Sequence, residues 1–283
     1  MNRLTALSRT GFLALSAFCL WQAFPHHSNT AAAHTPRYGT AVSGRLAHEA
    51  GQEVQAVVTS DLPDTGAASV ESSLDMIRQL RAAGDEEGLF RMTSLLSNPD
   101  HLQGIPVARR LLADRDAGMR QTGIDILTGS SLMNPEIHRL ALDTLKNEQD
   151  SRVLVHMLNK LDAPVDLYGK DTDMLATLHG LLNSPVADVR AQALLQLLQW
   201  DDYSTLEGYL YQAVNDPSSV VRLSAATVIG LIDTRSETLK GALINLRDNP
   251  TESRDIHETA QTAIKRIETI QQDNLRDSRT ANL

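Results

Sequence analysis

The residues His257-Glu-Thr-Ala-Gln261 come closest to a catalytic signature in this chain. The corresponding zinc-peptidase pattern has two histidines one helical turn apart, so that both rings reach one metal ion. Here Gln261 stands where the second histidine would be. We therefore interpret His257 as a residue at the surface or at a joint between helices, and we predict no zinc site.

The other histidines and aspartates also lack the spacing of metal ligands. The chain has nine histidines, and from residue 100 onward no two of them lie three or four residues apart. Asp171-Thr-Asp173 follows Asp162 and Asp166, and such a group of carboxylates can bind Ca²⁺. The glycine and the closing glutamate of a calcium loop are missing, however. We interpret this stretch as a solvated acidic loop, and we predict no metal and no cofactor.

Motifs for nucleophilic catalysis are missing as well. The only cysteine, Cys19, lies in an apolar segment near the amino terminus. The sequence has no Gly-x-Ser-x-Gly elbow and no glycine-rich phosphate loop. These absences lower the expectation of an enzyme, and we predict no catalytic residue.

Aromatic side chains gather in one short stretch. Trp200, Tyr203, Tyr209 and Tyr211 lie there, in a chain whose aromatic content is only 4%. Large rings are frequent anchors in protein interfaces, because they bury much area and lose few torsions. The same rings can instead fill a joint between two pairs of helices, which is the simpler interpretation. Trp200 is the partner anchor that this stretch predicts.

The elements that would carry these residues are helices in a repeated unit. Arg120, Arg152, Arg190, Arg222 and Arg254 are 32, 38, 32 and 32 residues apart, and each opens a helical run after a polar turn. Self-similarity at such a period is typical of stacked repeats, in which each unit needs its neighbours to cover its apolar face.

Apolar residues recur at intervals of three and four from residue 71 onward, which predicts amphipathic helices. Polar turns such as Asn183-Ser-Pro185 and Asn215-Asp-Pro217 separate them, so that we expect antiparallel pairs. Extra residues within 161–173 lengthen one connection, either as a tolerated insertion or as a loop on a binding face. We expect Ser72 or Ser73 to cap the first helix. The six predicted pairs are 74–81 with 89–96, 105–112 with 119–127, 135–145 with 153–161, 174–182 with 186–198, 206–214 with 220–232, and 239–246 with 256–270.

Two of these pairs share a longer pattern: Ser184-Pro-Val-Ala-Asp-Val-Arg190 aligns with Asp216-Pro-Ser-Ser-Val-Val-Arg222, and a small residue, Ala193 or Ala225, follows three positions later. In this pattern the two pairs resemble HEAT repeats. The HEAT family places an Asp-Pro type of turn before a second helix that opens with Val-Arg and carries such a small residue. The resemblance covers roughly residues 100–270, and it implies an all-α, armadillo-like solenoid of antiparallel hairpins.

The small residue three positions after the arginine, which we call the small position, lets neighbouring helices approach closely. It is occupied by Gly123 in the first aligned unit and by His257 in the last, as expected near the end of an array. The unit of Arg152 is the poorest match, because Lys146 stands where the other units have Asp or Ser.

An aspartate and an arginine six residues apart recur in three units. In HEAT arrays such pairs form a ladder between adjacent turns, and the resemblance implies the same role here. Exposed ion pairs contribute only about 0.2 to 1 kcal/mol each, so we expect the ladder to set register more than stability. The pairs are Asp114 and Arg120, Asp216 and Arg222, and Asp248 and Arg254.

The amino terminus has the pattern of an export signal. Arg3 and Arg9 precede an apolar run from Gly11 to Trp21, and Ala31-Ala-Ala33 offers a cleavage site. The run is shorter than the roughly 18 apolar residues that favour a permanent membrane anchor. We expect a signal peptide of bacterial type in 1–33, which would make the protein periplasmic or secreted. An uncleaved signal-anchor in the inner membrane is the alternative.

The segment 34–70 mixes Gly, Ser, Thr, Ala and Pro without a helical period, which is typical of a flexible linker. We expect the solenoid in 71–270 and a polar tail in 271–283. The formal net charge is −9, and loss of Arg3 and Arg9 with the signal would make it −11. An acidic chain without a basic block disfavours nucleic acid as a partner.

The sequence therefore predicts a non-catalytic protein-binding scaffold or adaptor in the cell envelope. The second helices of successive units would line the binding face, and the membrane would be reached only through an uncleaved 1–33. Two alternatives stay open. One is an enzyme or enzyme accessory similar to the phycobilin lyases, which some bacterial HEAT-like proteins resemble, and the other is an envelope assembly factor or chaperone. The expected partner contacts are Arg190, Gln192, Gln196, Arg222 and Ser224, with the four aromatic residues Trp200, Tyr203, Tyr209 and Tyr211.

Overall fold

The computed structural model describes residues 70–164, 167, 170–201 and 205–280, with side chains described up to Asp273. All of them belong to one compact unit, Leu62–Leu283. The predicted export signal, and the predicted linker up to residue 69, lie outside the described residues. Among the helices that are described, none is long and apolar enough to cross a membrane.

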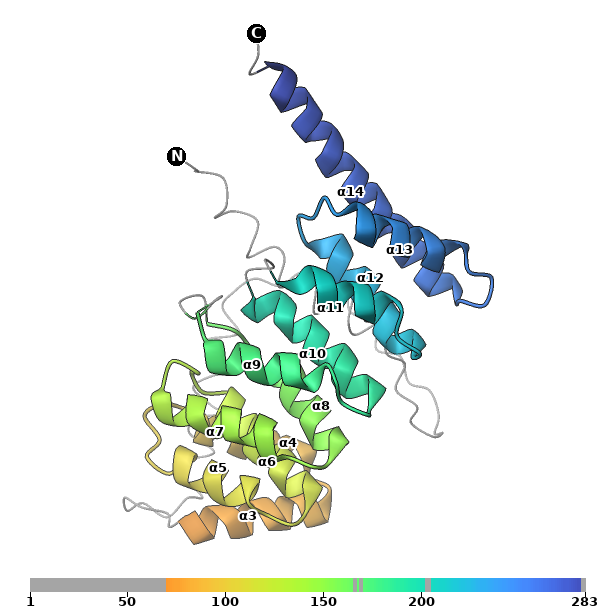
Figure 1. The fold of residues 1–283 in the computed structure, drawn as a ribbon. Coiled ribbons are helices and arrows are strands. Elements are labelled where there is room, and N and C mark those ends of the chain that lie inside the picture. Colours follow the sequence, from red (N-terminus) through yellow and green to blue (C-terminus); the bar gives the residue numbers. More distant parts are fainter. Residues whose placement is uncertain (1–69, 165–166, 168–169, 202–204, 281–283) are drawn as a thin grey trace, which may run out of the picture. The chain divides into compact units, whose positions relative to one another are not determined.

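The described residues form twelve α-helices and no strand, which confirms the all-α prediction (Figure 1). Each predicted helical run coincides with one of these helices, and apart from the end of α14 the bounds agree to within a few residues. The helices are α3 (Val70–Ala83), α4 (Glu86–Leu96), α5 (Gly104–Leu112), α6 (Ala117–Thr128), α7 (Pro135–Asn147), α8 (Ser151–Lys160), α9 (Thr172–Leu181), α10 (Ala187–Trp200), α11 (Leu206–Val214), α12 (Ser219–Leu231), α13 (Glu237–Asp248) and α14 (Arg254–Thr280).

Two predicted helix ends are wrong. Helix α3 begins at Val70, so that Ser72 and Ser73 lie inside its first turns and do not cap it, and Ser73 is buried. Helix α14 continues beyond the predicted end at Ile270 to Thr280. Its last turns contain no Gly or Pro that would stop a helix, and their Gln and Arg residues have good helix propensity.

Side-chain caps fix where seven of the twelve described helices begin. An oxygen of the N-cap side chain accepts a hydrogen bond from a backbone N–H of the first turn, which would otherwise have no partner inside the helix. These caps are Asp85, Asp116, Asn134, Asp150, Asp171, Ser236 and Ser253.

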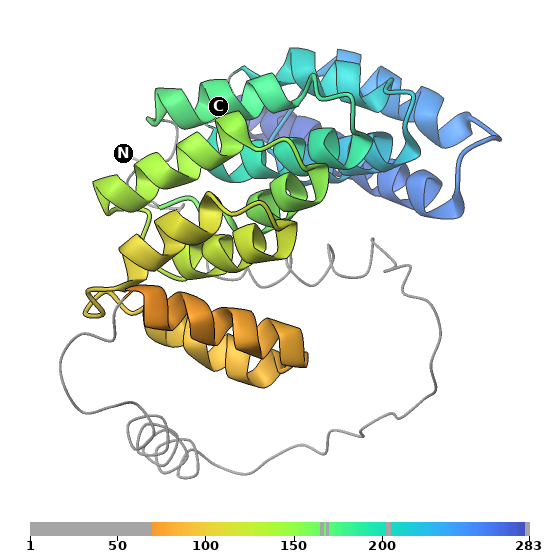
Figure 2. The same ribbon diagram turned by 90° about the horizontal axis from the view of Figure 1, so that it is seen from below.

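Substantial contacts join only helices that are one or two positions apart in chain order (Figures 1 and 2). Successive helices contact each other along the described array, except that contact is at most marginal between α8 and α9, between α10 and α11, and between α12 and α13. The even-numbered helices from α4 to α14 contact one another in an unbroken series, which we call the even row. The odd-numbered helices form a second series, the odd row, and this row is interrupted because α9 and α11 make at most marginal contact.

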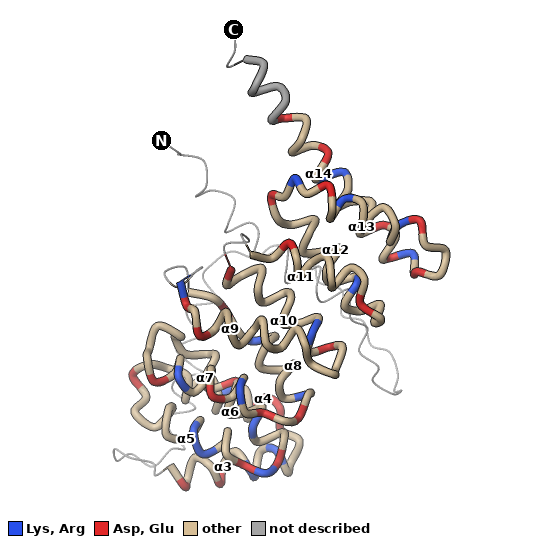
Figure 3. The backbone as a smooth tube through the Cα atoms, in the orientation of Figure 1, with Lys and Arg blue, Asp and Glu red and all other residues tan. Residues whose placement is uncertain are grey.

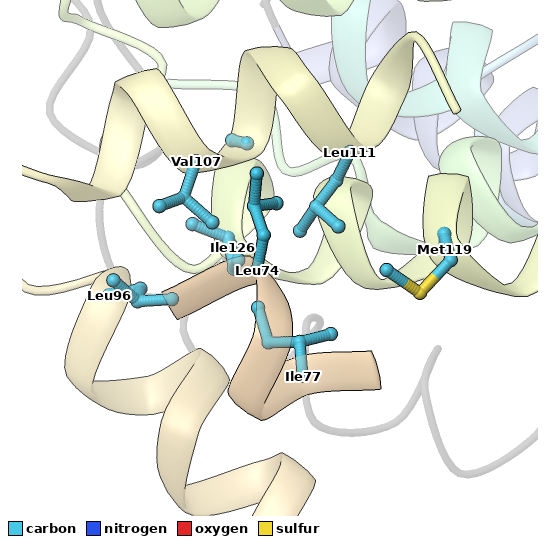
Figure 4. Close-up of a cluster of buried hydrophobic side chains, with 8 residues drawn as sticks. Leu74, Ile77, Leu96, Val107, Leu111, Met119 and Ile126 are labelled. Carbon is cyan, nitrogen blue, oxygen red and sulfur yellow. The ribbon is translucent and has the colours of Figure 1, made fainter. Parts of the chain in front are cut away.

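A buried apolar cluster joins the first two pairs of helices (Figure 4). Its members come from all four helices α3 to α6, so that neither pair could bury its apolar face alone. Complete burial of a leucine or isoleucine side chain stabilises the fold by about 1.5 to 3 kcal/mol relative to an exposed one. The labelled residues are Leu74, Ile77, Leu96, Val107, Leu111, Met119 and Ile126.

The small position of the repeated unit lies where helices approach closely. A Cβ atom added to Gly123 would lie 2.9 Å from Leu111 Cβ and 3.2 Å from the Ala108 carbonyl oxygen. Ala193 and Ala225 occupy the same position in later units and are completely buried. The structure thus agrees with the close helix contact that the sequence pattern predicts.

Candidate functional site

Three of the repeated arginines reach across to the turn of a neighbouring pair of helices. Arg190 donates from Nε and Nη2 to the two carboxylate oxygens of Asp216, at 2.9 and 2.7 Å. Arg190 also donates from Nη1 to the Ser184 carbonyl of its own turn, at 2.8 Å. Each arginine therefore connects two successive turns. We call this set the arginine ladder, and its rungs are Arg120–Glu148, Arg190–Asp216 and Arg222–Glu252.

The rungs are largely shielded from water. Only 15–18% of each arginine side chain and 4–12% of each carboxylate side chain is exposed. Burial acts to raise the pKa of Asp216, but hydrogen bonds from Arg190 and from the Ser218 N–H outweigh it and hold that pKa below its usual value. The pKa of Glu148 is lowered in the same way, against the effect of burial, by hydrogen bonds from Arg120 and backbone N–H groups.

The predicted ion pairs between an aspartate and an arginine of the same unit are wrong. Arg120 reaches only the carbonyl oxygen of Asp114, whose carboxylate accepts a backbone N–H, and its charged partner is Glu148. Arg222 likewise contacts the carbonyl of Asp216, because the Asp216 carboxylate binds the arginine of the preceding unit. The ladder exists between units, while the six-residue spacing supplies only a backbone contact.

The last predicted pair, Asp248 and Arg254, is not a rung. Asp248 accepts hydrogen bonds from its neighbour Arg247, and Arg254 pairs with Glu258 on its own helix. The physical reason is position. Arg254 begins α14, the last described helix, and among the described residues no later turn lies opposite it.

One rung is missing in the middle of the ladder. Arg152 folds back onto Asp150 at the start of its own helix, and 78% of the Arg152 side chain is exposed. The side-chain hydrogen bond from Arg152, followed by backbone N–H donors, lowers the pKa of Asp150 to about 2. This is the unit that matches the repeat pattern least and that precedes the lengthened connection within 161–173.

Trp200 cannot be the partner anchor that the sequence predicts. It is the last residue of α10 and is completely buried. Helices α8, α9 and α12 all pack against α10 and enclose it. This burial agrees with the alternative interpretation, in which the ring packs between helices.

The other members of the aromatic stretch differ in exposure. Tyr209 is half-buried and stacks on His179, with ring centroids 4.6 Å apart and an interplanar angle of 17°. Tyr211 is 46% exposed. Tyr203 lies outside the described residues. Of these side chains, Tyr211 is thus the one that a partner can reach without rearrangement.

The predicted contact positions on the second helices are also wrong for the most part. Gln192, Gln196 and Ser224 are buried, and Gln196 donates to the Leu158 carbonyl of α8. The guanidinium groups of Arg190 and Arg222 belong to the ladder. These helices form the even row, where each one is packed between the preceding and the following even-numbered helix, so that few of their polar groups reach solvent.

The most exposed large apolar side chains lie outside the aromatic stretch, at positions that were not among the predicted contacts. Phe90 on α4 is 71% exposed, which is unusual for a phenylalanine, and Leu102 before α5 is 89% exposed. Helical periodicity could have predicted the exposure of Phe90. Leu89 and Met92 lie on the face of α4 that packs against the core, and Phe90 lies off that face. The remaining large apolar residues that are well exposed are Met76, Met133, Val186 and Tyr211.

Four of the described histidines, His138, His156, His179 and His257, lie close to a carboxylate or a carbonyl oxygen of another segment. His257 is partly buried, and its Nε2 lies 2.8 Å from the Asn249 carbonyl, in agreement with a packing role at a helix joint. His138 pairs with Asp171, which also caps α9. His156 pairs with Asp125. Among the described residues, no group of three or more His, Cys, Asp or Glu could hold a metal ion.

A cleft opens where the odd row is interrupted, between α9 and α11. Its volume is about 370 Å³. Its apolar wall comes from the end of α9, from α10, from α11 and from α12, and its polar rim includes exposed amide side chains. The residues that line it are Leu182, Asn183, Ser184, Arg190, Leu194, Tyr209, Gln212, Ala213, Asp216, Pro217 and Val221.

Charges are mixed along the described helices. Figure 3 shows lysine and arginine interspersed with aspartate and glutamate, without a continuous basic stripe on the part of the chain that is described. Comparison of the chain with models of known protein families finds no match, and neither does comparison with curated protein sequences.

Proposed function

We propose that the chain is a non-catalytic, protein-binding scaffold built as a HEAT-like solenoid of six helical hairpins. The observation that carries the proposal is the contact pattern: substantial contacts join only helices one or two apart in chain order. Such one-dimensional packing is typical of repeat proteins, whose extended surfaces commonly bind other proteins.

The exposed apolar residues support a protein partner. Phe90 and Tyr211 are the two well-exposed aromatic residues among those described. They replace the buried Trp200 as the anchors to test, because large rings bury much area in an interface. A place in the cell envelope remains a proposal that depends on the sequence pattern of residues 1–33.

Photocrosslinking in the producing organism tests this function. A photoreactive amino acid placed at Phe90 or Tyr211 in the full chain should give discrete adducts with the same partner protein in repeated experiments. The matched control is Thr262, an exposed polar residue of α14. Adducts that are equal at all three positions, or absent from all of them, would refute the scaffold proposal.

A second arm separates binding from folding. Phe90→Ser should reduce copurification of the crosslinked partner at least severalfold while the melting temperature stays close to that of the wild type, because the ring is mostly exposed. Unchanged recovery with Phe90→Ser and with Tyr211→Ser would remove both anchors from the proposal.

A further inference from the structure

The cleft between α9 and α11 has a structural origin in the array. The even row is continuous through α8, α10 and α12, whereas α9 and α11 make at most marginal contact. The stacked rings of His179 and Tyr209 bridge them. The cleft is therefore a space between the pair α9/α10 and the pair α11/α12. These two pairs contact each other through α10 and α12.

The lining of this cleft combines an apolar wall with neutral polar groups. Leu194 is completely buried and Val221 nearly so. The apolar part of the lining that a ligand can touch is therefore formed by Leu182, Tyr209 and Pro217, which are half-buried or exposed. The only charged residues in the lining are Arg190 and Asp216, and these two neutralise each other as a rung of the ladder. A strongly charged ligand would find no free counter-charge in this lining.

Two amide side chains in the lining make no side-chain hydrogen bond to another described residue. Asn183 follows α9 and Gln212 lies near the end of α11, and both are exposed. Among the described residues, neither amide group takes part in a side-chain hydrogen bond. An amide both donates and accepts, which matches the N–H and C=O groups of a peptide backbone.

The size of the cleft limits what it can hold. A volume of about 370 Å³ lies at the low end for small-molecule sites and suits one large apolar side chain with the backbone next to it. Tyr209 is already held in place by its stack on His179, so that little ordering would be needed on binding.

We infer that this cleft binds an extended, uncharged segment of a partner polypeptide, with one apolar side chain inserted against Leu182 and Tyr209. The backbone of the segment hydrogen-bonds to Asn183 and Gln212 at the rim. This inference depends on the proposed scaffold function, and it names the chemistry that one of its surfaces recognises.

A library of random 12-residue peptides displayed on phage, selected on the full-length protein, tests the inference. The enriched peptides should share an apolar residue between uncharged neighbours. Gln212→Trp places a ring at the mouth of the cleft and should weaken their binding at least tenfold. The matched control is Asn245→Trp, an exposed amide on α13 outside the cleft. This control should bind like the wild type.

A gentler variant guards against misfolding of Gln212→Trp. Asn183→Ala removes only an exposed amide and should weaken binding about fivefold, the equivalent of one hydrogen bond. Failure to enrich any peptide, a charged consensus, or equal binding by the cleft variants and the wild type would overturn the inference. If the peptides bind Gln212→Trp and Asn183→Ala unchanged while the photocrosslinks at Phe90 and Tyr211 persist, the scaffold function stands and only the cleft is excluded.

Discussion

At the scale of single residues, shielding decides what the arginine ladder contributes. Exposed ion pairs contribute only about 0.2 to 1 kcal/mol, which is what the sequence pattern led us to expect for this ladder. Asp216 and Glu252, however, have side chains that are only 12% and 4% exposed. Removing one partner from such a pair leaves the other with an unsatisfied, poorly solvated charge. The rungs should therefore matter for stability as well as for register.

Asp216→Asn should lower the free energy of unfolding by about 1 to 3 kcal/mol, because Arg190 loses its charged acceptor. Urea denaturation followed by circular dichroism measures this change. Arg152→Gln is the matched control, since Arg152 is well exposed and pairs only with its own turn, and it should change stability by less than about 0.5 kcal/mol. Equal effects of the two substitutions would show that the rungs are no stronger than surface pairs.

The same rung predicts a pH dependence. The folded protein holds the pKa of Asp216 below its usual value, so that folding favours the ionised carboxylate. The contribution is therefore complete above the unfolded pKa of about 3.9 and is lost as the pH falls through the lower, folded pKa. The stability difference between wild type and Asp216→Asn should be constant from pH 6 to 8 and should shrink below about pH 4. A difference that grows on acidification would contradict this assignment.

Trp200→Ala should act on stability and not on recognition. The ring is completely buried, so that its loss should cost about 3 to 5 kcal/mol through lost burial and a cavity. Tyr211→Ala, at an exposed position of α11, should change the free energy of unfolding by less than about 0.5 kcal/mol. Thermal melts of the two variants check this contrast, and a Trp200→Ala protein that melts like the wild type would show that the ring is not in the core.

At the scale of helices, glycine is required where two helices approach closely. Where a helix has open space beside it, glycine only lowers the stability of that helix. Gly123→Ala should destabilise the protein by about 1 to 3 kcal/mol, because its Cβ would crowd Leu111 and the backbone of α5. Gly241→Ala in α13 meets nothing within 4 Å and should stabilise by up to about 1 kcal/mol through helix propensity. Chemical denaturation of both variants measures the two signs, and a stabilising Gly123→Ala would refute the tight contact of α5 with α6.

The helices themselves could be predicted from the sequence, because apolar periodicity and the Asn-Pro, Asp-Pro and Ser-Pro turns are local signals. The pairing of residues across units could not. Whether Arg120 meets Asp114 or Glu148 depends on how one turn lies above the next, and the spacing within one unit does not contain that information. For the same reason the sequence favoured Gln192 and Ser224 as surface residues, although neighbouring helices of the even row bury them. The exposure of Phe90 could have been predicted from its place off the apolar face of α4.

At the scale of the whole unit, packing between neighbours in chain order should make stability uneven. The helices at the two ends of the described array have a neighbouring pair on one side only, whereas α8 and α10 are supported on both sides. In a nearest-neighbour array the end units open at a lower free energy than the middle ones. A single globular core would instead open all its helices in one cooperative step.

Native-state hydrogen exchange of the full chain, resolved by residue, distinguishes these two cases. If each hairpin is held only by those beside it, amides of α3 and α4 will exchange through openings of lower free energy than amides of α8 and α10, and added denaturant will release the array from its ends inward. A single opening free energy for all twelve helices, or earlier opening of α8 and α10 than of the ends, would contradict the stacked arrangement and with it the scaffold proposed here.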